Sequence, residues 1–222
     1  MSDYSTARRN MVDGQVRPSS VTDWRIIDAM RTVPRDGFVP PSLRDMSYLD
    51  LDLNVAAPGE PPRCLLRPAV TARLLQAADL HSNDHVLVVG CATGYLAALA
   101  AKLAGRVTAT ESQPALAEQG RDMLKRLGGF GNIELQTAPA EHGAPDRAPF
   151  DVIILNGATE IVPLQLYQQL RLGGRLVGIF ARSQPPRAEI VIRSEGDFGS
   201  RILFDVAAPV LPGLQKLPEF AF

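Results

Sequence analysis

The stretch that decides the fold runs from His85 to Tyr95 and reads HVLVVGCATGY. Its first five residues are mostly apolar and β-branched, which predicts a short buried strand. Gly90 and Gly94 frame a tight turn, because glycine permits the backbone conformations that such a turn requires. The alanine-rich segment 95–105 then predicts a helix. A strand that enters a helix through a glycine-framed turn is typical of a ligand-binding βα unit in an open parallel sheet.

The rest of the chain after this turn continues to alternate between strands and helices. Strands are predicted at 106–111, 132–138, 150–155 and 174–180, and helices at 112–129 and 162–174. Ser112 is the expected cap of the first of these helices. This alternation predicts a doubly wound, mostly parallel sheet. Two further strands, at 188–194 and 200–207, predict an antiparallel hairpin at its end, and this finish is typical of a Rossmann-like methyltransferase domain.

The residues before position 80 show a different pattern, in which helical segments are joined by proline-rich connections. Helices are predicted at 24–33 and from about 68 to 78. We therefore expect a helical N-terminal extension over residues 1–80 and a Rossmann-like α/β domain over residues 81–222, together forming one compact unit. The apolar C-terminal segment 211–222 is expected to pack either on the body of the protein or on a partner.

The composition is that of an ordinary globular chain of 222 residues, with 45% hydrophobic residues and a formal net charge of −1. Basic residues are spread along the chain, so we expect no nucleic-acid partner. The sequence contains no run of 18 or more apolar residues, so we expect no membrane span. The first residues lack the apolar core of a secretory signal. These features predict a cytoplasmic protein without a membrane partner, and they give no oligomeric state.

The thiol and imidazole side chains suggest neither a disulfide framework nor a metal site. The two cysteines, Cys64 and Cys91, match no paired zinc spacing, and the three histidines do not cluster with cysteines or carboxylates. We therefore expect no bound metal.

A nucleoside is the ligand that the turn and the following strand favour together. That strand ends at Glu111, where a carboxylate can accept hydrogen bonds from ribose hydroxyls. The two glycines alone fit a plain tight turn equally well, so the prediction depends on the position of Glu111 and on the final hairpin.

The turn lacks the features that nucleoside phosphates require. A dinucleotide loop keeps glycines at positions that are Ala92 and Tyr95 in this chain, and the lysine of a triphosphate-binding loop is absent. S-adenosyl-L-methionine carries no phosphate and needs only a closely fitting turn. It is therefore the cofactor that this sequence favours.

Several longer segments are similar to one known family. These are VPRDGFVP at 33–40, SYLDLDLNV at 47–55, VLVVGCATGYLAALAAKLAGRVTATE at 86–111, APFDVIIL at 148–155 and LRLGGRLVGIF at 170–180. Spread over nearly the whole chain, they resemble the protein-L-isoaspartate O-methyltransferases. The resemblance implies a Rossmann-like class I methyltransferase fold, S-adenosyl-L-methionine as the cofactor, and protein or peptide substrates that contain isoaspartyl residues.

The resemblance places the substrate-facing segment at residues 62–68, PRCLLRP, where the family usually has GQTISQP. It implies Cys64, Leu65, Leu66 and Arg67 as candidates for substrate binding. Leu66 stands at the family's serine position, so no catalytic residue is assigned. Judged by itself, Arg67 equally fits a solvated arginine before a helix, and Cys64 fits a small buried group.

The resemblance also implies which residues surround the cofactor. The family's GDG motif, whose acidic residue lies near the adenine, is replaced by Ala138, Pro139 and Ala140, with Glu141 as a candidate substitute. The turn after the strand at 150–155 is expected on the floor of the pocket, although it equally fits a simple strand end. The candidate cofactor-binding residues are therefore Gly90, Cys91, Ala92, Thr93, Gly94, Glu111, Pro139, Ala140, Glu141, Asn156 and Gly157.

The changed substrate-facing segment leaves three hypotheses for the activity. The first is methylation of isoaspartyl carboxylates in damaged proteins. The second is a methyltransferase with another acceptor. The third is a non-catalytic homologue that binds the cofactor.

Overall fold

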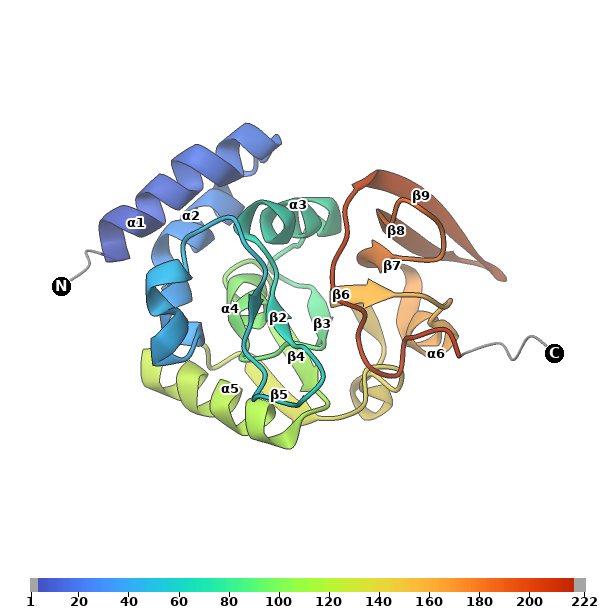
Figure 1. The fold of residues 1–222 in the computed structure, drawn as a ribbon. Helices are drawn as coiled ribbons and strands as arrows, with labels where there is room; N and C mark the ends of the chain where they lie inside the picture. The colour runs from blue at the N-terminus through green and yellow to red at the C-terminus, as the bar shows by residue number, and fades with distance from the viewer. Residues whose placement is uncertain (1–3, 218–222) are drawn as a thin grey trace.

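The computed structural model describes residues 4–217, which form a central sheet covered by helices and an N-terminal helical extension (Figure 1). The described residues build a seven-stranded sheet in the order β5-β4-β3-β6-β7-β8-β9. Its strands are β3 (His85–Val89), β4 (Arg106–Glu111), β5 (Ile133–Thr137), β6 (Phe150–Thr159), β7 (Leu170–Phe180), β8 (Arg187–Ser194) and β9 (Asp197–Asp205). The pairs from β5 to β7 are parallel, whereas β8 and β9 run antiparallel to their neighbours. The structure thus confirms the predicted mostly parallel α/β sheet that ends in a hairpin.

Helices cover the sheet and build the extension. They are α1 (Tyr4–Met11), α2 (Trp24–Thr32), α3 (Pro68–Ala78), α4 (Tyr95–Ala101), α5 (Pro114–Leu127) and α6 (Leu164–Gln168), with a π-helical turn at Val12–Val16 and 3₁₀ turns at Arg17–Ser19, Arg35–Phe38, Pro41–Met46 and Pro145–Arg147. Two short strands of the extension, β1 (Leu53–Asn54) and β2 (Cys64–Leu65), pair antiparallel. Between residues 4 and 217, none of the helices combines the length and the apolar character that crossing a membrane needs.

Strand β3 shows how the sheet divides the core into two apolar layers. Successive side chains of a strand point to opposite faces, so Val86 and Val88 join the layer that contains α3, α4, α5 and the extension. Leu87 and Val89 join the smaller layer on the other face, which contains α6. The C-terminal segment, described here over residues 209–217, also packs on this second face through two buried leucines. The extension and the sheet therefore share one core.

Two predictions about helix boundaries are wrong. The helix expected at 162–174 is confined to the short α6, because Leu170 already pairs with Phe150 and β7 continues from there. Ser112 does not cap α5, whose N-cap position is Gln113. The Ser112 hydroxyl pairs instead with side chains at the carboxyl edge of the sheet.

An arginine of β7 fastens α3 to the sheet. The Arg175 guanidinium donates to the carbonyl oxygens of Ala78 and Asp79, at the end of α3, and lies 3.3 Å from the Asp84 carboxylate. The last carbonyl groups of a helix lack donors within the helix, so Arg175 satisfies acceptors that would otherwise need water. The substrate-facing segment ends at Pro68, where α3 begins. The Arg175 contact therefore also holds the helix that follows this segment.

We expect Arg175→Ala to lower the free energy of unfolding by about 1–3 kcal/mol, because it removes the cationic partner of the buried Asp84 carboxylate and the donor to two helix-end carbonyls. Arg171→Ala is the matched control on the same strand. The Arg171 side chain is 56% exposed in its ion pair with Asp151, and exposed pairs contribute about 0–1 kcal/mol. Urea denaturation followed by circular dichroism measures both variants. Equal losses of stability would contradict the role assigned to Arg175.

Candidate functional site

The strand order reverses beside β3, and this reversal places the candidate site. From β3 the chain moves outward through β4 and β5 on one side and then returns to β6 on the other side. In open α/β sheets, ligands bind at such a reversal, beyond the carboxyl ends of the strands. Gly90 follows β3, Glu111 ends β4 and Asn156 lies in β6. The structure therefore brings these three predicted residues to the same edge of the sheet.

The turn after β3 adopts the left-handed backbone conformation that its first glycine predicts. Gly90 has a φ of +69°. Ala92 also has a positive φ, of +51°, which is uncommon for a residue with a side chain. The Ala92 N–H donates to a Glu111 carboxylate oxygen at 2.8 Å. This bond supports a backbone conformation that the side chain of Ala92 disfavours.

The other residues of the turn are buried and tied to neighbouring elements. The Cys91 N–H donates to the Thr110 carbonyl in β4. The Thr93 hydroxyl donates to the Phe38 carbonyl and so joins the turn to the extension. Gly94, with a φ of +94°, is the N-cap of α4. The turn is thus fixed on both sides before any ligand is considered.

Glu111 is fully buried, and its carboxylate is bound by groups of the same chain. Arg63 Nε lies 2.8 Å from one carboxylate oxygen, which also accepts the Gln113 N–H at 3.0 Å. The Arg63 side chain is 2% exposed and also donates to the Ser112 hydroxyl. A buried ion pair of this kind compensates both charges, and loss of one partner leaves the other uncompensated. The carboxylate expected to bind a ribose is therefore occupied by an arginine.

Asn156 joins the turn to the substrate-facing segment. Its side-chain amide donates to the Gly90 carbonyl at 2.9 Å and to the Cys64 carbonyl at 3.0 Å. Because Cys64 lies in β2, this single amide of β6 joins β2 to the turn after β3. The expected floor of the pocket is thus covered by the substrate-facing segment itself.

The C-terminal segment covers the same edge. The Leu211 N–H donates to the Ala158 carbonyl, and the Ala158 N–H donates to the Pro209 carbonyl. A side-chain carbon added at Gly90 would lie 2.5 Å from a Leu211 methyl carbon, and one added at Gly157 would lie 2.8 Å from the same carbon. Leu211 therefore fills the space next to both glycines, where the strand order reverses.

The residues that replace the family's GDG motif meet the same segment. Ala140 is buried in the apolar layer that contains Leu211. The Glu141 carboxylate approaches Gly213 so closely that a side-chain carbon at Gly213 would lie 1.8 Å from one of its oxygens. Pro139 is exposed. The C-terminal segment therefore contacts the region where the resemblance places the adenine.

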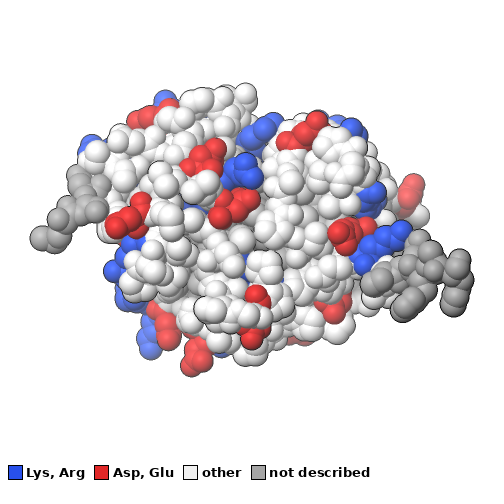
Figure 2. Space-filling view, viewed as in Figure 1, with Lys and Arg blue, Asp and Glu red and all other residues white. Residues whose placement is uncertain are grey.

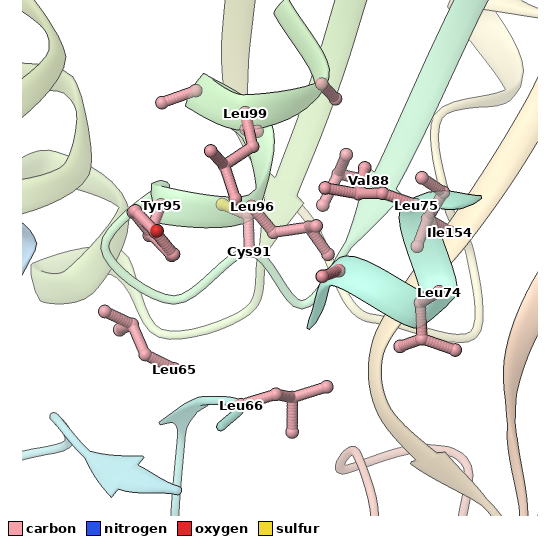
Figure 3. Packing of buried hydrophobic residues seen from close by; sticks show 14 of the residues in the cluster. Leu65, Leu66, Leu74, Leu75, Val88, Cys91, Tyr95, Leu96, Leu99 and Ile154 are labelled. Carbon is pink, nitrogen blue, oxygen red and sulfur yellow. The ribbon is translucent and has the colours of Figure 1, made fainter. Parts of the chain in front are cut away.

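The substrate-facing candidates of β2 point into the core. Cys64 and Leu65 form this strand, and Leu65 and Leu66 are each 2% exposed. Figure 3 shows the two leucines in the same apolar cluster as Tyr95 and the leucines of α3. The carbonyl groups of Leu65 and Leu66 accept hydrogen bonds from the buried Arg35 guanidinium. Leu66 is thus a core residue at the family's serine position.

Arg67 and Cys64 are both engaged by their local surroundings. The Arg67 N–H donates to an Asp52 carboxylate oxygen at 2.7 Å, and the guanidinium lies 3.3 Å from the other oxygen. Burial raises the pKa of the Cys64 thiol to about 11, with a smaller contribution from Asp52. The thiol therefore stays protonated at neutral pH and is a poor nucleophile.

Two residues of this edge, Arg63 and Leu211, are absent from the sequence predictions. Arg63 lies within the substrate-facing segment 62–68 but outside its four candidates, and Leu211 lies in the C-terminal segment that is expected to pack on the body of the protein or on a partner. An acidic residue at the end of a buried strand signals that a cationic or donor group must meet it. The sequence pattern does not identify which arginine of the chain reaches Glu111.

A cavity of about 670 Å³ lies next to the residues that follow Glu111. It is lined by residues of the β1–β2 loop, of the 3₁₀ turn at Pro41–Met46 and of the start of α5, among them Val55, Ser112 and Gln113. None of its lining residues belongs to the turn after β3, whereas Ser112 and Gln113 directly follow Glu111.

The sheet order and the turn after β3 are those of the Rossmann-like methyltransferase fold. The structure matches a solved protein-L-isoaspartate O-methyltransferase with a TM-score of 0.82 and 22% identity, over 94% of this chain and 67% of that one. A putative protein-L-isoaspartate O-methyltransferase from Plasmodium falciparum, solved in complex with S-adenosyl-L-homocysteine, matches with a TM-score of 0.78 and 16% identity. That match covers 92% of this chain and 97% of the other. At these identities, the two likenesses establish the fold.

Sequence comparison identifies the family. The sequence profile of protein-L-isoaspartate(D-aspartate) O-methyltransferase matches residues 7–197. The protein-L-isoaspartate O-methyltransferase of Rhodopseudomonas palustris is 34% identical over 209 residues, which cover 92% of this chain and 93% of the relative. Protein-L-isoaspartate O-methyltransferase 2 of Anaeromyxobacter sp. is 38% identical over 172 residues, covering 78% of this chain and 69% of the relative. The chain belongs to the protein-L-isoaspartate(D-aspartate) O-methyltransferase family, which confirms the resemblance in its sequence.

We expect Arg63→Met to lower the free energy of unfolding by about 3–5 kcal/mol, because it leaves the buried Glu111 carboxylate uncompensated. Glu111→Gln should cost a comparable amount, since it leaves the guanidinium without its counter-charge. The double variant should lose clearly less free energy of unfolding than the two single variants lose together. The difference measures the coupling free energy between the two side chains. Urea denaturation of the four proteins completes the cycle. Additive losses would rule out a direct ion pair.

We expect both thiols to react slowly with a disulfide reagent at pH 8 in the folded protein and rapidly in denaturant. The raised pKa keeps Cys64 protonated until the pH approaches 11, and burial raises the pKa of Cys91 well above its usual value. Cys64→Ala and Cys91→Ala variants assign the two signals. If Cys64 in the folded protein reacted like a free cysteine, whose pKa is about 8.5, β2 would not be closed as described.

Proposed function

We propose that this chain is an S-adenosyl-L-methionine-dependent O-methyltransferase that acts on isoaspartyl carboxylates in damaged proteins or peptides. The observation that carries the proposal is the family match over residues 7–197, combined with the turn after β3 and Glu111 at the reversal of strand order. The relatives are named for this activity. The turn and the acidic strand end are the parts of such a fold that meet a nucleoside.

The proposed cofactor-facing residues share the carboxyl edge of the sheet. Glu111 is proposed to accept hydrogen bonds from the ribose hydroxyls. The rest of the set is Gly90, Cys91, Ala92, Thr93, Gly94, Pro139, Ala140, Glu141, Asn156 and Gly157. Cys64, Leu65, Leu66 and Arg67 are proposed to lie nearest the acceptor. The support for these four is the alignment of their segment, since their side chains face the core or bind Asp52.

In the described conformation, two of these positions are in contact with other side chains of the same chain. Both oxygens of Glu111 are bound, one by Arg63 and the other by the Ala92 N–H, and Leu211 fills the space next to Gly90. A nucleoside at this edge would need both side chains to move. We call this arrangement, with Arg63 on Glu111 and Leu211 next to Gly90, the closed edge.

A carboxylate acceptor requires positioning from the protein more than it requires a base. The carboxylate is ionised at neutral pH and is itself the nucleophile, so alignment and exclusion of water are the main requirements. The absence of a serine hydroxyl at Leu66 therefore concerns how the acceptor is held rather than how a proton is removed.

Specific observations favour each of the two other functions. A different acceptor is favoured by the core position of Leu66 and by the engagement of Arg67 with Asp52, because neither side chain is free to meet an isoaspartyl group. A non-catalytic homologue is favoured by the Arg63–Glu111 pair, which occupies the proposed ribose acceptor.

We also propose a cytoplasmic location and no nucleic-acid partner. On the face seen in Figure 2, Lys and Arg side chains are interspersed with Asp and Glu rather than gathered into a basic patch. The formal net charge of −1 gives no general attraction to a phosphate backbone.

The purified protein should transfer labelled methyl groups from S-adenosyl-L-methionine to an isoaspartyl peptide at least ten times faster than to the same peptide with a normal aspartyl residue. Scintillation counting of the peptide measures the transfer, and added S-adenosyl-L-homocysteine should inhibit it. If the protein preferred an unrelated acceptor, it would be a methyltransferase with another substrate. No transfer to any acceptor, with cofactor binding retained, would leave the non-catalytic function.

A further inference from the structure

We propose that Arg63 and Leu211 are internal competitors of the cofactor, which binds only after Arg63 leaves Glu111 and Leu211 leaves the space next to Gly90 and Gly157. This inference rests on the proposed function and adds that the chain's own side chains set its affinity for the cofactor. Neither Arg63 nor Leu211 is assigned a role in the reaction itself.

Arg63 competes with a ribose for the same acceptor. A guanidinium donates to carboxylates through several N–H groups held in a fixed planar geometry. Its Nε lies 2.8 Å from the Glu111 carboxylate, and both side chains are almost completely buried. A ribose that displaced it would replace a charge-assisted hydrogen bond between ions with bonds from neutral hydroxyls. Arg63 therefore weakens nucleoside binding even though the carboxylate stands in the expected place.

Leu211 competes at a second point that does not involve Glu111. One of its methyl groups lies next to Gly90 and Gly157, the two positions at the strand reversal where the lack of a side chain leaves space. Leu214 anchors the same segment, since its side chain is fully buried and its carbonyl accepts the Glu160 N–H. These contacts fix the segment along β6, so Leu211 is held in the site by the fold.

Both competitors lie on segments outside the strands of the seven-stranded sheet. Arg63 ends a loop whose residues 57–62 are exposed, and the Gln113 side chain fastens this loop by a hydrogen bond to the Pro61 carbonyl. The described part of the C-terminal segment joins β6 through an isolated bridge rather than a full strand. Opening of such local segments costs less free energy than global unfolding. The closed edge can therefore open while the turn after β3 stays in place.

The test is calorimetric titration of S-adenosyl-L-methionine into the full-length wild-type protein, Arg63→Gln, Leu211→Ala and the double variant. Each single substitution should tighten binding at least tenfold, because it removes one competitor. The double variant should bind more tightly than either single variant. Glutamine at position 63 keeps an amide donor of similar reach and removes the charge that competes for Glu111.

Arg171→Ala and Leu217→Ala are the matched controls. Arg171 also pairs with a carboxylate through its Nε, but it does so at the start of β7, at the opposite edge of the sheet. Leu217 belongs to the C-terminal segment and is 83% exposed. Neither substitution should change the affinity. Circular dichroism at the titration temperature shows whether each variant is folded.

Hydrogen exchange gives a second measurement that needs no variant. The amides of Ala158 and Leu211 are hydrogen-bonded between β6 and the C-terminal segment in the closed form. Saturating S-adenosyl-L-methionine should speed the exchange of the Leu211 amide, because the segment must leave the site. Unchanged or slower exchange at Leu211 on binding would contradict displacement.

The titrations also separate this inference from the proposed function. Wild-type binding as tight as that of the variants would overturn the competition and leave the methyltransferase function standing. No binding by any of the proteins, the double variant included, would overturn both, because the emptied edge would then accept no cofactor.

Discussion

The buried carboxylate of Glu111 is the point at which the sheet, the turn after β3 and the extension meet. Glu111 ends β4, accepts the Ala92 N–H of the turn and pairs with Arg63 of the extension. A charge without water needs compensation from the protein, so each of these contacts depends on the others. The positive φ of Ala92, the path of the β1–β2 loop and the closed edge of the sheet all depend on this one group.

The substrate-facing segment differs from the family pattern in a consistent direction. Leu66 is packed in the core, Arg67 binds Asp52, and the carbonyl of Cys64 accepts from Asn156. In this chain, the side chains of Leu66 and Arg67 are both engaged by the fold. Burial of a leucine side chain contributes roughly 1.5–3 kcal/mol, so the loss of a hydroxyl at this position is accompanied by a gain in packing. The segment serves here as a structural strand at the edge of the site.

The sequence predicts the sheet well because its signals are local. The apolar run before Gly90 and the acidic end of β4 are short-range patterns, and parallel strands bring their carboxyl ends to one edge whatever the loops do. The end of α6 is harder to predict, since it depends on the pairing of Leu170 with Phe150 across the sheet. The pairing of Arg63 with Glu111 spans 48 positions and is set by the path of the extension, which no periodicity records. The position of the C-terminal segment next to Gly90 is likewise set by long-range packing that no sequence periodicity records.

The pairing of Glu111 also changes what a mutation at this position can reveal. Where an acidic strand end contacts only a ligand, its replacement isolates the ligand's contribution. Here the same carboxylate neutralises an interior arginine and steadies the turn. A Glu111 variant therefore perturbs two equilibria at once, and a loss of activity in it would be ambiguous between a damaged fold and a lost cofactor.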